Sequence, residues 1–231
     1  MKNSEGPMNP GQWKTLHAGE LAFFAKISAS ISHEIKNHLA IINEQNGLLG
    51  DLLAMTERGG VLPASRLRTG VGDISRQVVL TDTIVRRFNT FVHTADRALD
   101  NVDVGDFLSL LAHIAGRLVR LKEMSLEVHK CPEHILMRTH PFEFLHILYV
   151  CLEILLNGGA VGKQIHLGFS PEAENVLVVF TAAEGLNQEN VNLDLPLLLL
   201  LSDRLQVVIA SSNATGILTL RFPLNLDSRL D

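Results

Sequence analysis

The chain has 231 residues, of which 46% are hydrophobic and 19% are charged. This is the composition of an ordered globular protein with room for one or two domains. Its formal net charge is −5 and it contains no basic block, so a nucleic-acid-binding protein is not expected.

Cysteine content and hydropathy favour a soluble protein in a reducing compartment, which we take to be the cytoplasm. Cys131 and Cys151 form no C-x-x-C pair and offer no metal cage. The longest apolar run, Leu195–Leu201, is too short to cross a bilayer. The polar segment Met1–Gln12 has no hydrophobic signal core. We therefore expect neither insertion into a membrane nor a metal site.

A long amphipathic helix is predicted from about Trp13 to Arg58, where Gly59 and Gly60 end it. No Gly or Pro interrupts it between Glu20 and Asn46. At about 100° per residue, one face collects Phe24, Ile31, Ile35, Leu39, Ile42 and Leu49. The same phase points His33 away from that face, with Asn37 one turn on and Glu34 at its flank.

A second helix is predicted from a Ser65 cap to about Leu99. Val71, Val78, Val85 and Val92 recur every seven residues, with Ile74, Thr81 and Phe88 at the intervening positions. Two long helices joined by a tight turn form an antiparallel hairpin, and such a hairpin commonly pairs with a second copy as a four-helix bundle. We expect this homodimer; the alternative is a hairpin packed on its own C-terminal domain.

Asp100–Asp103 is a short polar joint, so the predicted domains are residues 13–100 and 104–231. Beyond it, helices are predicted at Val104–Leu121, Pro141–Leu156 and Leu195–Leu205. Strands are predicted at Ser125–Lys130, Ile135–Thr139, Lys163–Ser170, Asn175–Ala182, Gln206–Ser211 and Gly216–Pro223. Helices with mostly antiparallel strands favour an α/β sandwich after the hairpin, and hence an α+β fold overall.

His33 suits the role of a phosphoryl acceptor, because a neutral imidazole on an exposed face is open to in-line attack and an adjacent carboxylate can take its other proton. The alternative is an ordinary surface histidine, one of 10 in the chain. A zinc site of the H-E-x-x-H type is excluded, because the second histidine, His38, comes five residues later. The two rings then diverge by about 140°.

The segment His33–Leu39 reads His-Glu-Ile-Lys-Asn-His-Leu and resembles the H-box of the dimerisation and phosphoacceptor domain of sensor histidine kinases. The resemblance implies that His33 is phosphorylated, that Glu34 assists as a base, and that Asn37 positions a hydrolytic water. His38 stands where the family often has Pro. The hydrophobic residues before the motif and the helical hairpin after it also match the family.

The second half resembles the ATP-binding domain of the same family with its nucleotide site dismantled. Leu152–Ala160 is similar to the N-box, which makes Asn157 a vestigial Mg²⁺ ligand. The family's Asp-x-Gly-x-Gly box aligns with Ala183–Asn187, which reads Ala-Glu-Gly-Leu-Asn. Six leucines and a proline at Leu195–Leu201 replace the glycine-rich lid that admits phosphates. The final hairpin, Ser211–Pro223, resembles the family's closing strands.

These resemblances imply a two-component phosphorelay protein, a histidine phosphotransferase or pseudokinase. It carries a phosphoryl group on His33 and exchanges it with response-regulator receiver domains, without ATP-dependent autophosphorylation. We expect no cofactor of its own, since Mg²⁺ is supplied at the receiver domain. The alternatives are a response-regulator phosphatase, a non-catalytic dimer that binds a regulator, and an atypical sensor histidine kinase.

Overall fold

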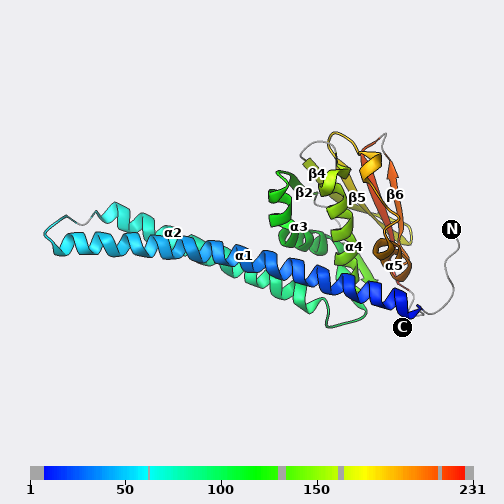
Figure 1. Cartoon of the computed structure of the whole chain (residues 1–231), viewed down its shortest axis with the longest axis horizontal. Helices are drawn as coiled ribbons and strands as arrows, with labels where there is room; N and C mark the ends of the chain where they lie inside the picture. The colour runs from blue at the N-terminus through cyan, green and yellow to red at the C-terminus, as the bar shows by residue number, and fades with distance from the viewer. Residues whose placement is uncertain (1–7, 62, 130–133, 161–163, 213–214, 227–231) are drawn as a thin grey trace. The chain divides into compact units, whose positions relative to one another are not determined.

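The computed structural model describes residues 8–61, 63–129, 134–160, 164–212 and 215–226. Helices and two sheets occur together (Figure 1), which confirms the predicted α+β class. By its contacts the chain divides into two compact units. The hairpin unit is Ser28–Thr90, and the core unit comprises Met1–Ile27 with Phe91–Asp231. Cys131, one of the two cysteines, lies outside the described residues.

The hairpin unit contains most of two helices, α1 (Pro10–Glu57) from Ser28 onward and α2 (Ala64–His93) up to Thr90. Helix α1 continues through Gly47 and Gly50, and it ends where the backbone N–H of Gly60 donates to the carbonyl of Met55. Helix α2 differs from the prediction at both ends. It begins before Ser65, which lies in its first turn, and it ends six residues before Leu99.

The two helices meet along a seam of half-buried or buried residues spaced alternately three and four apart, the spacing of a coiled coil. The seam residues are Ile35, His38, Ile42, Gln45, Leu49 and Leu52 from α1, and Leu67, Gly70, Ile74, Gln77, Thr81, Ile84 and Phe88 from α2. His38 Nδ1 lies 2.5 Å from Gln77 Oε1. A Cβ on Gly70 would come within 2.9 Å of Leu49 Cδ2, so the small residue permits close approach there.

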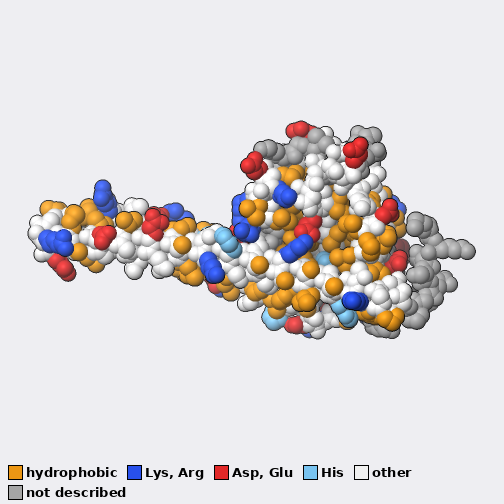
Figure 2. Space-filling view, in the orientation of Figure 1, with side chains coloured by type: hydrophobic (Ala, Val, Ile, Leu, Met, Phe, Trp, Pro, Cys, Tyr) orange, Lys and Arg blue, Asp and Glu red, His pale blue; other side chains and the backbone are white. Residues whose placement is uncertain are grey.

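The valines of α2 lie outside this seam. Val71, Val78 and Val85, which we call the valine stripe, are 55%, 52% and 39% exposed. Within the single chain the valines therefore lie outside the contact between α1 and α2, because each helix turns only two of every seven positions directly toward its one partner. Leu39, predicted on the buried face of α1, is also exposed. Hydrophobic side chains are visible along the hairpin surface in Figure 2.

The core unit is built on a five-stranded sheet with the order β2-β4-β5-β7-β6. Its strands are β2 (Ser125–Val128), β4 (Gln164–Glu172), β5 (Asn175–Ala182), β6 (Val208–Ser212) and β7 (Ile217–Pro223). Strands β2 and β4 are parallel and the other pairs antiparallel. Lys130 and Lys163, at the ends of two predicted strands, and residues 213 and 214, within the predicted final hairpin, lie outside the described residues.

A second, two-stranded sheet corrects one prediction. Asp100–Asp103, expected as a polar joint, is strand β1, and it pairs antiparallel with β3 (Leu136–Thr139). Val102 is the buried residue that holds it, opposite the buried Met137. Asp103 then caps helix α3 (Val104–Leu121) by accepting a hydrogen bond from the Asp106 backbone N–H.

Helices α3, α4 (Pro141–Ile154) and α5 (Pro196–Arg204) belong to the same unit (Figure 1). The sheet's buried face comprises Ile165, Leu167, Val176, Val178, Phe180, Leu218, Leu220 and Phe222. Phe144 of α4 meets Phe222 edge to face at 5.0 Å between ring centroids, so α4 packs on this face. The segment Pro141–Gly158 is long and apolar enough to span a membrane, but 78% of it is buried within the protein, as expected for a core helix.

An aromatic cluster joins the first part of α1 and the end of α2 to α4 within the core unit. Phe23 stacks on His146 with ring centroids 4.6 Å apart and an interplanar angle of 1°. Phe91 meets Phe23 edge to face at 5.4 Å, and Phe142 and Tyr149 complete the cluster at 5.4 and 4.9 Å from Phe23. Such pairs contribute about 0.5–1.5 kcal/mol each beyond their area burial.

Ionic and close backbone contacts reinforce this packing. Glu143 of α4 accepts from the guanidinium of Arg204 at the end of α5, with Arg204 Nε 2.9 Å from Glu143 Oε1, and the two side chains are 9% and 13% exposed. Arg204 also lies over the ring of Trp13, at 5.4 Å from the centroid. Gly19 permits the close approach of Leu197, whose Cδ1 a Cβ would meet at 2.6 Å.

The buried His146 predicts a dependence of stability on pH. Burial, and secondarily the charge of Lys26, lowers the pKa of His146 from 6.5 to about 4, and among the described residues none hydrogen-bonds its Nδ1. Between these values the unfolded chain binds more protons than the folded one, so the free energy of unfolding falls as pH drops from about 6.5 to about 4. The full loss is about 3 kcal/mol.

We expect His146→Leu to remove this part of the acid destabilisation. Urea unfolding at pH 7, 6 and 5 measures it, with His113→Ala, an exposed histidine of α3, as the matched control. An acid loss equal in the wild type, His146→Leu and His113→Ala would contradict the assignment to His146.

Candidate functional site

The predicted phosphoacceptor residues lie on α1 in the hairpin unit. His33 and Asn37 are exposed and Glu34 is half-buried. His33 and Asn37 share one face because residues four apart lie one above the other on a helix. Glu34 follows His33 at about 100° around the axis. The helix runs through this segment without a break, so the three positions are held in fixed phase.

The seam determines the direction in which His33 points. Ile35 and His38 occupy seam positions, and His33 lies two residues before Ile35, on the outer side of the helix. His38 turns into the hairpin, where it is half-buried and meets Gln77. The rings of His33 and His38 therefore point to different sides of α1, as expected from their spacing of five residues.

This exposed face suits chemistry on a docked protein better than chemistry on a small molecule. The imidazole of His33 is exposed on the surface of α1. An amide one turn away, at Asn37, can donate or accept a hydrogen bond to a water or a phosphoryl oxygen. A half-buried carboxylate at Glu34 can accept a proton from the imidazole.

Asn157 lies in a π-helical turn, η1 (Leu155–Gly159), that continues α4. Its backbone leaves helical geometry at φ −90° and ψ 25°, and its side chain is exposed. Gly158 follows at φ +106°, a conformation that favours glycine. Its carbonyl accepts from the side-chain amide of Asn190 at 3.1 Å. The turn after Asn157 is thus held by the short helix η2 (Gln188–Asn190).

The segment that aligns with the family's adenine box adjoins this turn. Ala160 forms a bridge with Leu186, so the structure brings Leu152–Ala160 and Ala183–Asn187 together. Ala183 and Glu184 are exposed, and Gly185 has φ +103°. The leucine-rich segment then forms α5, as predicted, with Leu198 and Leu201 buried. A packed helix presents no row of free backbone N–H groups to phosphates.

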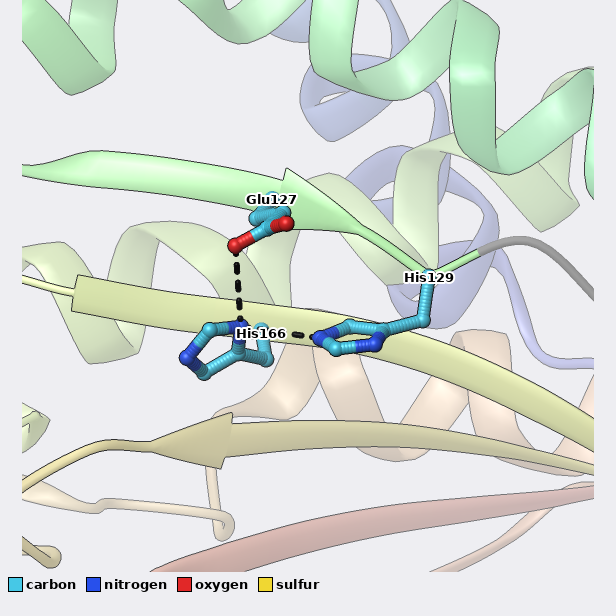
Figure 3. Close-up of side chains that lie close together, drawn as sticks. All are labelled: Glu127, His129 and His166. Atoms are coloured by element: carbon cyan, nitrogen blue, oxygen red, sulfur yellow. Dashed lines mark hydrogen bonds and ion pairs between the residues drawn. The ribbon is translucent and has the colours of Figure 1, made fainter.

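The sequence analysis missed one group of potential ligands on the sheet. Glu127 lies in β2, His129 directly follows it, and His166 lies on the neighbouring strand β4 (Figure 3). His129 Nε2 lies 2.9 Å from His166 Nδ1, which lies 3.4 Å from Glu127 Oε2. The only trace in the sequence is the alternation Glu-x-His in a strand, because 37 positions separate His129 from His166.

Among known proteins, no family model and no curated protein matches the chain. Solved structures with similar folds include the Acinetobacter baumannii histidine kinase AdeS, at 12% identity and a TM-score of 0.44 over 83% of this chain and 98% of that one. The ATP-binding domain of PrrB from Mycobacterium tuberculosis has 20% identity and a TM-score of 0.43, over 55% and 98% of the respective chains.

A third is the histidine kinase ThkA in complex with response regulator protein TrrA, at 13% identity and a TM-score of 0.44, over 90% of this chain and 64% of that one. AdeS and ThkA are described as histidine kinases, and the PrrB structure as an ATP-binding domain. At TM-scores below 0.5 these likenesses decide neither the family nor the activity of this chain.

The altered surroundings of Asn157 generate a prediction about nucleotide binding. We expect Mg-ATP titrated into the full chain to give no saturable heat in a calorimeter, because α5 occupies the sequence position of a phosphate-binding loop. Saturable binding that Asn157→Ala weakens by at least about tenfold would show that the nucleotide site is intact, and the interpretation of Asn157 as vestigial would then be wrong.

Proposed function

We propose that the chain is a two-component phosphorelay protein in which His33 carries a phosphoryl group and exchanges it with response-regulator receiver domains. The observation that carries the proposal is the exposed pair His33 and Asn37, one turn apart on an unbroken helix of a two-helix hairpin. The segment around this pair resembles the H-box of sensor histidine kinases. The position is open to a docked domain from the outer side of the hairpin.

The transfer step needs few groups from this chain. An imidazole nitrogen of His33 attacks the phosphorus of a receiver's aspartyl phosphate, the P–O bond breaks, and the aspartate carboxylate leaves with the electron pair. The proton on the other ring nitrogen passes to Glu34. The receiver's Mg²⁺ balances charge on the phosphoryl oxygens. The reverse sequence delivers the group to a second receiver.

The state of the C-terminal segment favours phosphotransfer over autophosphorylation from ATP. Helix α5 stands where the resemblance calls for a glycine-rich lid, and its leucines are used in packing. Ala183 stands where the family has the aspartate that binds adenine. A receiver's aspartyl phosphate is then the phosphoryl donor that remains.

The exposed apolar residues of the hairpin favour a homodimer. The valine stripe of α2 and Leu39 and Leu53 of α1 occupy the position that directly follows the second seam residue in each heptad. In an antiparallel pair these positions fall on the same side of the seam. Leu39 and Leu53 are 47% and 52% exposed. A second copy related by a twofold axis covers this side and completes a four-helix bundle.

A phosphoryl-transfer assay tests the proposed function. The receiver domains of the source organism are labelled on aspartate with radioactive acetyl phosphate and mixed with the full chain. We expect acid-labile label on the chain, lost in His33→Ala and retained in His17→Ala, an exposed histidine of the same helix. Label retained in His33→Ala would remove His33 as the acceptor.

The same assay separates the alternatives. Loss of receiver phosphate without labelled chain, abolished by Asn37→Ala but not by His33→Ala, identifies a phosphatase. A stable complex without either reaction identifies a regulator-binding protein. Label on His33 from γ-labelled ATP identifies an atypical kinase.

Substitution of two neighbouring valines, Val78 and Val79, tests the proposed dimer. Val78→Glu places a charge in the proposed interface, twice per dimer because of the twofold axis. We expect the dimer dissociation constant in analytical ultracentrifugation to rise at least about a hundredfold, since burying each valine contributes about 1.5–3 kcal/mol.

Val79→Glu is the matched control, because Val79 is 64% exposed and points to a different side of α2. Equal effects of the two substitutions, or a monomeric wild type, would contradict the proposed interface.

A further inference from the structure

The ligand group formed by Glu127, His129 and His166 lies on the exposed face of the five-stranded sheet. Residues alternate between the two faces of a strand. On β4 the neighbours Ile165 and Leu167 are buried and His166 is half-buried on the other face. Parallel pairing places Glu127 opposite His166, and the bond from His129 N–H to the Leu167 carbonyl, 2.8 Å, continues that register. Backbone pairing therefore holds all three residues together.

The side chains converge instead of pointing into solvent separately (Figure 3). One ligand atom from each of the three residues lies within 4.8 Å of the others. His166 Nδ1 lies at the centre, near both His129 Nε2 and a Glu127 oxygen. A single proton on His166 Nδ1 cannot be donated fully to both neighbours. A metal cation between the three side chains can instead accept an electron pair from each of Glu127, His129 and His166.

We propose that Glu127, His129 and His166 bind one divalent transition-metal ion of the zinc class. Two imidazole nitrogens and one carboxylate form a donor set that Zn²⁺ uses, at about 2.0–2.2 Å from each ligand atom. Mg²⁺ and Ca²⁺ prefer oxygen donors alone. Rotation of the three side chains, without movement of the strands, brings their ligand atoms within reach of one metal ion.

The site leaves room for a further ligand. It borders a hollow of about 430 Å³ on the same face, lined by His129, His166, Gly168, Phe169, Ser170, Val179 and Thr181. Gly168 contributes no side chain, and Thr181 is the cross-strand partner of His166. Three protein ligands with an open fourth position are typical of zinc sites that hold a water or a small molecule. Ser170 and Thr181 contribute hydroxyl groups to the lining of the hollow.

This site is independent of the proposed phosphotransfer, because it shares no residue with the face around His33. It also goes against the expectation from the sequence that the chain holds no metal. That expectation rested on cysteine spacing and on the H-E-x-x-H pattern, and neither bears on ligands joined by strand pairing.

Zinc chloride titrated into the metal-free full chain tests the proposal by calorimetry. We expect one Zn²⁺ per chain, with the dissociation constant raised at least about tenfold in His166→Ala and in Glu127→Gln. Glu127→Gln keeps the size and shape of the side chain and replaces only its charge, so it guards against misfolding as the cause. His113→Ala, an exposed histidine on α3 of the same unit, is the matched control and retains wild-type affinity.

Cobalt substitution gives a second readout that does not depend on heat. Co²⁺ bound by the three residues and a water produces the visible bands of a tetrahedral site, and Glu127→Gln weakens them. Zinc binding that His113→Ala reduces as much as His166→Ala, binding unchanged by all three substitutions, or no binding above that of free histidine would overturn the proposal. In that event the three residues form only a surface hydrogen-bonded network.

Discussion

Helix α1 changes its packing partner near Ile27 while its backbone stays one continuous helix of 48 residues. Before that point, Leu16, Phe23 and Ile27 are buried within the core unit. After it, the half-buried residues follow the seam with α2. A helix fixes the angle between successive side chains. The seam residues fix the rotation of α1 about its axis, and this determines the direction in which His33 points. The exposure of His33 is a consequence of the phase that Ile35 and His38 impose on the hairpin unit.

The hairpin places some polar side chains in its otherwise mostly apolar seam and leaves three valines outside it. Its seam includes His38 and Gln77, which meet each other, whereas the valine stripe faces outward. A hairpin that functioned alone would gain stability by the opposite arrangement, because burying a valine contributes about 1.5–3 kcal/mol. In a four-helix bundle both the seam and the stripe are interior. The distribution of apolar residues therefore favours the homodimer that we propose over a solitary hairpin.

Local patterns predicted the helices well and the contacts between strands poorly. The bounds of α1, α3 and α5 follow from apolar periodicity and from glycine and proline positions. Strand β1 was missed because three of its four residues are polar and one buried valine, Val102, holds it. The group around His166 was missed because it depends on the parallel register of two strands. No local pattern encodes that register, since it is set by tertiary pairing.

The packing of helix α5 within the core unit opposes a second role for this segment as a phosphate-binding loop. Leu197 fits against Gly19 of α1, Leu198 and Leu201 are buried, and Arg204 is paired with the buried Glu143 of α4. Withdrawing the two buried leucines alone would cost about 3–6 kcal/mol, a large fraction of the stability of a typical domain. A phosphate-binding loop must instead rearrange around its ligand. The contacts that anchor α5 therefore oppose nucleotide binding at this position, and they favour the proposed exchange of the phosphoryl group on His33 with a receiver domain.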